Sequence, residues 1–116
     1  MLHLAMSDFE HKNARHPIYL EEWRKSLTDL SQAGFADALG MHQSSYSYIE
    51  SGTRRANLDQ LFNIADYLGI EPEQLFRSPE DPVNGLIGLF AKVPKKDKKK
   101  AVGLFRAILK ESFDLT

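Results

Sequence analysis

The sequence predicts an all-α protein made of five short helices followed by two C-terminal helices. Apolar residues recur three and four positions apart along most of the 116-residue chain, which is the period of one helix face. Glycine, proline and capping residues divide this pattern into short segments, as helix ends require. Between residues 17 and 77 no segment needs the two-residue alternation of a half-buried strand.

The composition fits one domain with a modest core. Apolar residues make up 42% of the chain and charged residues 27%, which argues against wholesale disorder. There is no cysteine, so disulfides and thiolate metal sites are excluded. No apolar run approaches the roughly 18 residues of a membrane span. The first residues lack the basic start of a signal peptide, so we expect a cytoplasmic protein.

Charge is distributed unevenly, although the net charge is only −1. Residues 61–82 carry five acidic residues and one basic residue, whereas residues 83–116 carry eight basic and three acidic residues. The distribution of charge says more about partners than its sum does. An acidic middle and a basic tail therefore indicate two roles in one small chain.

The N-terminal part should contain an arm and a first helix. Residues 1–16 are polar and aperiodic, so we expect a mobile arm. Pro17 suits the first turn of a helix over residues 17–27, because its missing N–H is not needed there. The inner face of that helix carries Leu20, Trp23 and Leu27.

Two short helices should follow, separated by a sharp turn. Ser31 is a good N-cap for a helix over residues 32–39, and Gly40 can adopt the left-handed conformation that ends it. The next helix should cover residues 43–51 and end at Gly52.

The fourth and fifth helices are predicted from their own start signals. Asn57 with Gln60 forms the pattern of a capping box before a helix over residues 58–68. Gly69 closes that helix, and the Glu-Pro pair at residues 71–72 starts a short fifth one.

Two further helices are expected after a joint at residues 78–82. Asp81 as N-cap and Pro82 at the first position start a helix through about residue 92. Its apolar residues go nearly all round, so we expect it to be buried on more than one side. A Val-Pro pair interrupts, and a last helix over residues 95–113 is apolar on one half and basic on the other.

The helix over residues 43–51 has two different faces. Tyr46 and Ile49 are three positions apart and should point inward. The outer face is short, polar and uncharged, and its amides and hydroxyls can match the donor and acceptor edges of bases in the major groove. It consists of Gln43, Ser44, Ser47, Tyr48 and Ser51.

A capped helix, a glycine turn and a second helix make the pattern of a helix-turn-helix, in which small Ala36 permits a close crossing. Here the chain resembles the Cro/C1-type (XRE) helix-turn-helix family of phage-repressor-like domains. The resemblance covers about residues 18–77, and a weaker similarity to a bacterial subgroup extends to the C-terminal helices. The matching positions are 30–32, Phe35, Ala36, 39–41, Gln43, Ser44, 49–52, Leu58, Ile64, Ala65, Leu68 and Gly69.

The resemblance implies a five-helix, lambda-repressor-like domain whose third helix enters the major groove of double-stranded DNA, usually as a symmetric dimer on a palindromic operator. It places Gln43 and Ser44 at base-contacting positions. Tyr48 lies one turn later, where it would contact a thymine methyl or a phosphate, or simply be exposed. The expected base-contacting set is Gln43, Ser44, Ser47 and Tyr48.

The resemblance also implies phosphate contacts and an internal brace. Arg24 and Glu50 match positions that commonly form an ion pair between the first and third helices. His42 stands where Ser or Thr is usual, as a substitute cap or a phosphate donor, and Tyr46 is bulkier than the usual Ile or Val. The expected phosphate-contacting set is Gln32, His42, Ser45, Thr53, Arg54 and Arg55.

Residues 78–116 are expected to form a dimerisation segment, because a monomer would struggle to cover both apolar helices. The lysine-rich run over residues 95–100 is expected to be a solvated face, with flanking DNA, an acidic partner or the chain's own residues 71–81 as alternatives. A membrane-surface role is a further alternative, but dimerisation plus packing on the front domain explains the apolar half better. The expected dimerisation residues are Leu86, Leu89, Phe90, Leu104, Phe105 and Ile108.

We therefore expect a sequence-specific DNA-binding transcriptional regulator, a repressor that occupies a palindromic operator as a homodimer in the nucleoid. Two alternatives stay open: an antitoxin-type regulator whose basic tail masks a toxin, and a protein-interaction module without DNA binding. No catalytic set, phosphate loop or metal-ligand spacing of the four histidines is present, so no enzymatic activity, cofactor, metal or small-molecule ligand is expected. The expected divisions are 1–16, 17–77 and 78–116.

Overall fold

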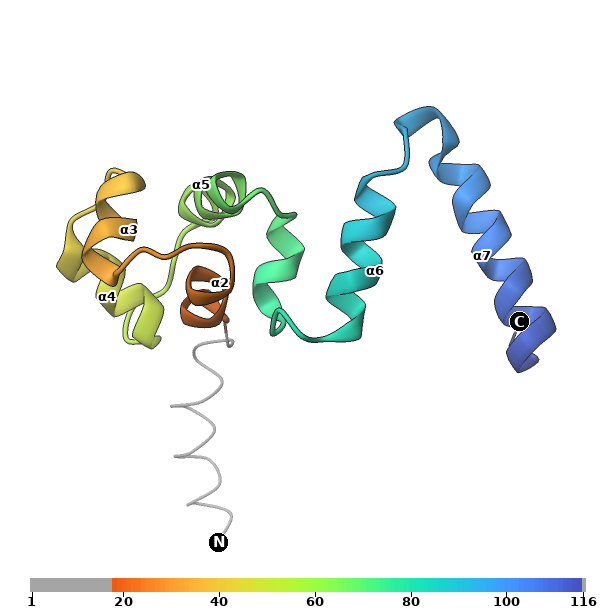
Figure 1. Cartoon of the computed structure of the whole chain (residues 1–116), viewed down its shortest axis with the longest axis horizontal. Helices are drawn as coiled ribbons and strands as arrows, with labels where there is room; N and C mark the ends of the chain where they lie inside the picture. Colours follow the sequence, from red (N-terminus) through yellow and green to blue (C-terminus); the bar gives the residue numbers. More distant parts are fainter. Residues whose placement is uncertain (1–17, 116) are drawn as a thin grey trace, which may run out of the picture.

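The computed structural model describes residues 18–115, which are helical throughout apart from their connections (Figure 1). The expected N-terminal arm with its three histidines, and Pro17, lie outside the described residues. The elements are α2 (Leu20–Leu27), α3 (Gln32–Ala38), α4 (Gln43–Ser51), α5 (Leu58–Leu68), the 3-10 helix η1 (Pro72–Phe76), α6 (Pro82–Ala91), the 3-10 turn η2 (Lys95–Asp97) and α7 (Lys98–Phe113).

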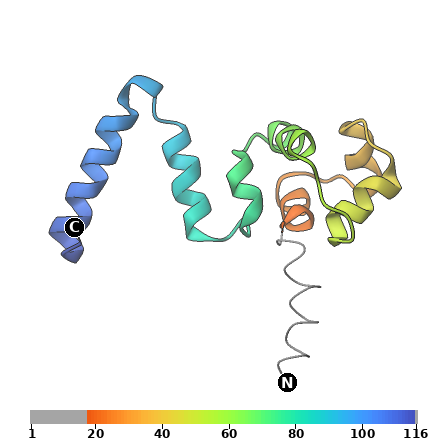
Figure 2. The same ribbon diagram turned by 180° about the vertical axis from the view of Figure 1, so that it is seen from behind.

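The two ends of the described chain are organised differently. Helices α2 to α5 and η1 gather into one cluster, whereas α6 stands beside η1 and α7 lies beyond α6, as Figures 1 and 2 show from opposite sides.

Local signals in the sequence account for most helix ends. The Ser31 hydroxyl accepts a hydrogen bond from the backbone N–H of Gly34, and Asn57 forms a reciprocal capping box with Gln60. α4 ends at Gly52, whose φ of +84° lies in the left-handed region that side chains with a Cβ disfavour. These boundaries agree with the sequence prediction.

Two predicted helix starts and one predicted helix type differ from the structure. α2 begins at Leu20 rather than at Pro17, because Tyr19 has a non-helical backbone and donates its N–H to the Leu75 carbonyl of η1 at 2.9 Å. The predicted fifth helix is the 3-10 helix η1. The predicted last helix opens with the 3-10 turn η2, closed by the bond from Asp97 N–H to the Pro94 carbonyl at 2.8 Å, before α7 begins.

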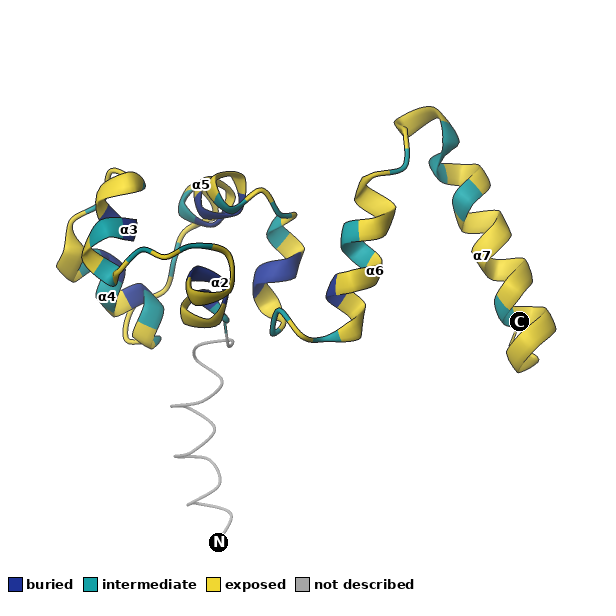
Figure 3. Ribbon diagram, viewed as in Figure 1, coloured by how far each residue is buried: buried dark blue, intermediate teal, exposed yellow. Residues whose placement is uncertain are grey.

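The core lies entirely within the N-terminal cluster. Phe35 packs edge-on against Tyr46, with 5.3 Å between ring centroids, and neither side chain is exposed. Figure 3 shows the buried positions concentrated on the facing sides of α2 to α5 and η1. The buried apolar residues are Leu20, Trp23, Phe35, Ala36, Tyr46, Ile49, Leu61, Ile64, Ala65 and Leu75.

The expected burial of α6 on more than one side is wrong for the single chain, and α7 does not pack on the N-terminal cluster. Asn84 is the only buried residue in α6, and α7 has none. Instead of reaching the core, apolar side chains of both helices line an open groove, which Glu71 and Glu73 at η1 also line. Leu89 is 66% exposed and Ile108 56% exposed. None of the described helices combines the length and apolar character needed to cross a bilayer.

One lysine of the run over residues 95–100 stabilises the turn between α6 and α7. Lys98 donates its Nζ to the Phe90 carbonyl at 2.7 Å and lies 4.4 Å from the centre of the Phe90 ring. A cation at the C-terminal end of α6 is favourable because the last carbonyls of a helix carry partial negative charge. Lys98 is therefore a structural residue, whereas Lys95, Lys96, Lys99 and Lys100 are exposed.

Candidate nucleic-acid interface

Helices α3 and α4 form a compact helix-turn-helix. Ala36 is 1% exposed and its carbonyl accepts the N–H of Met41 at 2.8 Å, which brings the start of α4 back towards α3. Gly40 has a φ of +71°, so the turn between the helices uses the left-handed conformation that glycine adopts without strain. The small residue and the turn glycine have the roles that their spacing predicted.

The outer and inner faces of α4 separate as expected. Tyr46 and Ile49 are buried in the core, at 0% and 2% exposure. Gln43, Ser44 and Tyr48 are exposed on the opposite side, while Ser45 and Ser47 are half-buried. A row of uncharged polar side chains thus faces solvent from the first two turns of α4.

The Glu50 carboxylate holds α2, α3 and α4 together. Arg24 of α2 binds it through two nitrogens, Nε to Oε2 at 2.9 Å and Nη2 to Oε1 at 3.2 Å. Gln32 of α3 donates its Nε2 to Oε1 at 2.7 Å, and the Tyr46 hydroxyl donates to Oε2 at 2.7 Å. The second guanidinium branch of Arg24 donates to the Leu30 carbonyl at 2.9 Å. The ion pair expected between Arg24 and Glu50 is thus the centre of a larger network.

This network is electrostatically coupled. Burial acts to raise the pKa of Glu50, but the hydrogen bonds from Arg24, Gln32 and Tyr46 outweigh it and hold the pKa of the carboxyl below its ordinary value. Burial, followed by the hydrogen bond to Glu50, raises the pKa of Tyr46. The hydrogen bond to Glu50 raises the pKa of Arg24. Glu50 is therefore a carboxylate, and Tyr46 a neutral donor, at neutral pH.

Two parts of the network were missed by sequence reasoning. Tyr46 was expected to point inward as a bulky core residue, but its hydroxyl contact was not predicted, although its position four residues before Glu50 on one helix brings the two side chains together. Gln32 was expected to reach a phosphate, but its amide nitrogen is bound to Glu50 and points into the brace. Its side chain is half-buried as a result.

The C-terminal end of α4 continues into a polar exit loop over residues 51–55. The Arg54 guanidinium lies 5.1 Å from the centre of the Tyr48 ring, and the Arg54 N–H donates to the Tyr48 carbonyl at 3.0 Å. The hydroxyls of Ser51 and Thr53 lie 3.0 Å apart. At the other end of α4, exposed His42 occupies the N-cap position but makes no side-chain capping bond, so the expected substitute cap is not formed.

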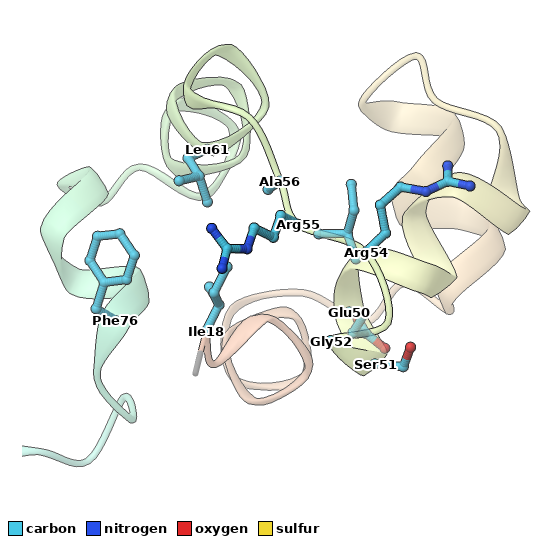
Figure 4. A pocket seen from close by; sticks show the side chains of 10 residues that line it. Ile18, Glu50, Ser51, Gly52, Arg54, Arg55, Ala56, Leu61 and Phe76 are labelled. Atoms are coloured by element: carbon cyan, nitrogen blue, oxygen red, sulfur yellow. The ribbon is translucent and has the colours of Figure 1, made fainter. Parts of the chain in front are cut away.

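Arg54 and Arg55 do not project in the same direction. In Figure 4, Arg55 extends towards Ile18 and Leu61, while Arg54 extends to the other side of the loop. Both line a shallow pocket whose walls also include Phe76 of η1. The structure thus brings Arg54 to the side of Tyr48 and leaves Arg55 separate, although the sequence had grouped them.

Comparison with known proteins identifies the family of this chain. A helix-turn-helix family model matches residues 20–75, which covers α2 to η1 and leaves α6 and α7 outside. Control protein C.MunI of Mycoplasma sp is 41% identical over 61 residues, covering 53% of this chain and 82% of the relative. No solved structure matches the chain. The chain therefore belongs to the Cro/C1-type helix-turn-helix family of non-enzymatic, DNA-binding transcriptional regulators.

Proposed function

We propose that the chain is a repressor that binds a palindromic operator in double-stranded DNA as a homodimer. The observation that carries this proposal is the uncharged polar face of α4, exposed at its first turns and braced from behind by the Glu50 network. A rigid helix with a polar outer face fits the major groove, where base edges offer donors and acceptors. Bound across a promoter in the nucleoid, such a dimer excludes polymerase.

In this proposal the base-reading residues are Gln43 and Ser44, with Ser47 and Tyr48 further along the helix. The amide of Gln43 can bond adenine in a bidentate manner, which is worth roughly 1–3 kcal/mol of discrimination. Ser47 is half-buried and therefore reaches less far than Gln43. Base reading is assigned mainly to the N-terminal turn of α4.

Phosphate contacts are assigned to the two ends of α4. His42 and Ser45 lie at its start, and Thr53 and Arg54 lie in its exit loop. Gln32 is assigned a phosphate contact through its backbone at the start of α3, because its side-chain amide is bound to Glu50. Arg55 projects away from Arg54, so its proposed phosphate contact is the weaker of the two.

Dimerisation through α6 and α7 is supported by the apolar surface that these helices expose. The single chain leaves their facing sides open along a groove lined on α6 and on α7. Contiguous apolar surface of this kind marks an interaction site in a soluble protein. The residues proposed to meet a second copy are Leu86, Leu89, Phe90, Leu104, Phe105 and Ile108.

The test is a selection of bound sequences from random double-stranded DNA with the whole protein. We expect an inverted repeat to be enriched, because a two-fold dimer places two copies of α4 in successive major grooves. Gln43→Ala should lose base preference at one position in each half-site and keep the rest of the repeat. Enrichment of no repeat, together with no effect of Gln43→Ala, would instead favour a protein-interaction module.

The same protein can test the antitoxin alternative. The exposed lysines of residues 95–100 and the basic face of α7 offer a surface to an acidic partner. A partner protein that copurifies at a defined stoichiometry, and is released by charge reversal at Lys99 and Lys100, would favour that alternative over a regulator acting alone.

A further inference from the structure

Asn84 connects α6 to the end of η1 and the residues that follow it through buried polar contacts. It is 2% exposed, although it lies in a helix whose other residues are half-buried or exposed. Its Nδ2 lies within hydrogen-bond distance of three carbonyl oxygens, those of Gln74 at 3.2 Å, Arg77 at 3.1 Å and Ser78 at 2.7 Å. Because all three neighbours are acceptors, the side-chain atom that faces them is the amide nitrogen of Asn84 and not its oxygen.

Two of these carbonyls also bind the DNA-binding part of the chain. The indole Nε1 of Trp23 in α2 lies 3.0 Å from the Gln74 carbonyl oxygen and 3.0 Å from that of Arg77. Trp23 is itself 5% exposed. The end of η1 is therefore held by α2 and by α6 through the same two oxygens.

The side chain of Gln74 completes this joint. Its Nε2 donates to the Asn84 carbonyl at 3.3 Å, and its Oε1 accepts the N–H of Glu71 at 2.9 Å. Gly88, one turn after Asn84, lies beside the Gln74 amide: a Cβ built there would be 3.9 Å from Nε2, an ordinary van der Waals contact. The Oδ1 of Asn84 is buried without a hydrogen-bond partner among the described residues, so the joint depends on the bonds of Nδ2 and of the Gln74 amide. These bonds are directional, and rotating α6 away from η1 would leave their buried donors and acceptors unpaired as well.

We infer that the joint formed by Trp23, Gln74 and Asn84 sets the distance and rotation between the two operator half-sites. This inference rests on the proposed function, in which α4 reads a half-site and α6 with α7 joins two copies. The direction in which α6 leaves η1 then decides where the second α4 lies on the DNA. One base pair changes the separation by about 3.4 Å and the rotation by roughly 35°, so a rigid joint selects one spacing.

The test uses the whole protein and a DNA library in which two fixed half-sites are separated by a variable number of base pairs. For the wild-type protein we expect one spacing to bind at least about tenfold more tightly than its neighbours. Asn84→Ala, and Asn84→Asp, which sets a carboxylate against three carbonyl oxygens, should keep the half-site sequence and the dimer mass. Both should reduce the preference between neighbouring spacings to about threefold or less. Asn63→Ala, at an exposed asparagine of α5, is the matched control and should behave as wild type.

A second variant tests the joint without breaking it. One alanine inserted after Gly88 leaves Asn84, Gly88 and their partners in place and rotates everything that follows by about 100°. We expect a single preferred spacing with a new value. An unchanged spacing in this variant, or an unchanged preference in both Asn84 variants, would overturn the inference.

Different results would disprove the proposed function and the role of the joint. If the wild-type protein enriches no paired half-sites, the proposed function fails and the inference fails with it. If the wild-type protein selects one spacing and the variants select the same one, only the role of the joint is overturned.

Discussion

The guanidinium of Arg54 lies over the ring of Tyr48, 5.1 Å from its centre, and joins the exit loop to the outer face of α4. Tyr48 is 46% exposed, so the pair lies at the surface. A cation on an exposed aromatic ring contributes roughly 0.5–1 kcal/mol, enough to favour one direction for a long side chain. The contact gives Tyr48 a role besides the proposed base contact, since its ring positions a cation beside the helix.

Tyr48→Ala should therefore weaken the phosphate contact proposed for Arg54. On a log–log plot of operator affinity against salt concentration, we expect the slope to become shallower by about 0.9 per subunit, the value of one phosphate contact. Tyr48→Phe keeps the ring and should leave the slope unchanged. A loss of equal size in both variants would mean that the Tyr48 hydroxyl, rather than the ring, contacts DNA.

Glu50→Ala should strongly destabilise the domain. The side chains of Arg24 and Glu50 are only 9% and 3% exposed, so removing the carboxylate leaves a buried guanidinium without its counter-charge. Loss of one partner of such a pair costs about 3–5 kcal/mol, measured as the free energy of unfolding in urea. The exposed pair between Glu21 and Lys25 is the control, and Glu21→Ala should cost less than about 1 kcal/mol. Equal effects of the two substitutions would contradict a buried brace.

The same carboxylate should make stability depend on acid pH. The pKa of Glu50 is lowered in the folded state, so the unfolded chain takes up its proton first as the pH falls. This contribution is complete above the ordinary glutamate pKa of about 4.3 and disappears as the pH falls through the folded-state value. Unfolding in urea between pH 7 and pH 3 should show a smaller decrease for Glu50→Gln than for the wild type. Parallel decreases would assign the acid sensitivity to other carboxylates.

Leu89→Asp should produce a monomer that still recognises a half-site. Leu89 is 66% exposed at the groove between α6 and α7, so a charge there opposes association without disturbing the core. Leu58→Asp is the matched control, since Leu58 is 70% exposed on α5 in the N-terminal cluster. Sedimentation equilibrium should give a monomer for the first variant and a dimer for the second. The reverse result would assign the dimer interface to α5.

Local sequence signals predicted most of the fold, because helix ends depend on nearby residues. The capping box of Asn57 with Gln60 and the turn glycine Gly40 needed only a few neighbouring positions to be interpreted. The two faces of α4 also followed from periodicity alone. The start of α2 was harder to predict, because the N–H of Tyr19 bonds to a carbonyl of η1, far away in sequence.

Local sequence signals could not predict the polar contacts between residues that are far apart in the sequence. Trp23 and Asn84 are 61 positions apart in the numbering, and nothing in a helical pattern shows that they bind the same two carbonyls. The departure of Gln32 from its expected role has a related cause, since its partner Glu50 lies in another helix. By contrast, Tyr46 and Glu50 are four positions apart on α4, and the spacing could have indicated their contact.

The confinement of the core to residues 20–75 has a consequence for how the protein responds to dilution. The N-terminal cluster covers its own apolar side chains, so its melting temperature should not depend on protein concentration. In the proposed dimer a second copy covers the facing sides of α6 and α7, so the helicity of these two helices should depend on protein concentration through mass action. In a cell with few copies of the protein, the N-terminal cluster would be folded but the protein would be monomeric. Operator occupancy would then rise steeply with protein concentration once the proposed dimer forms.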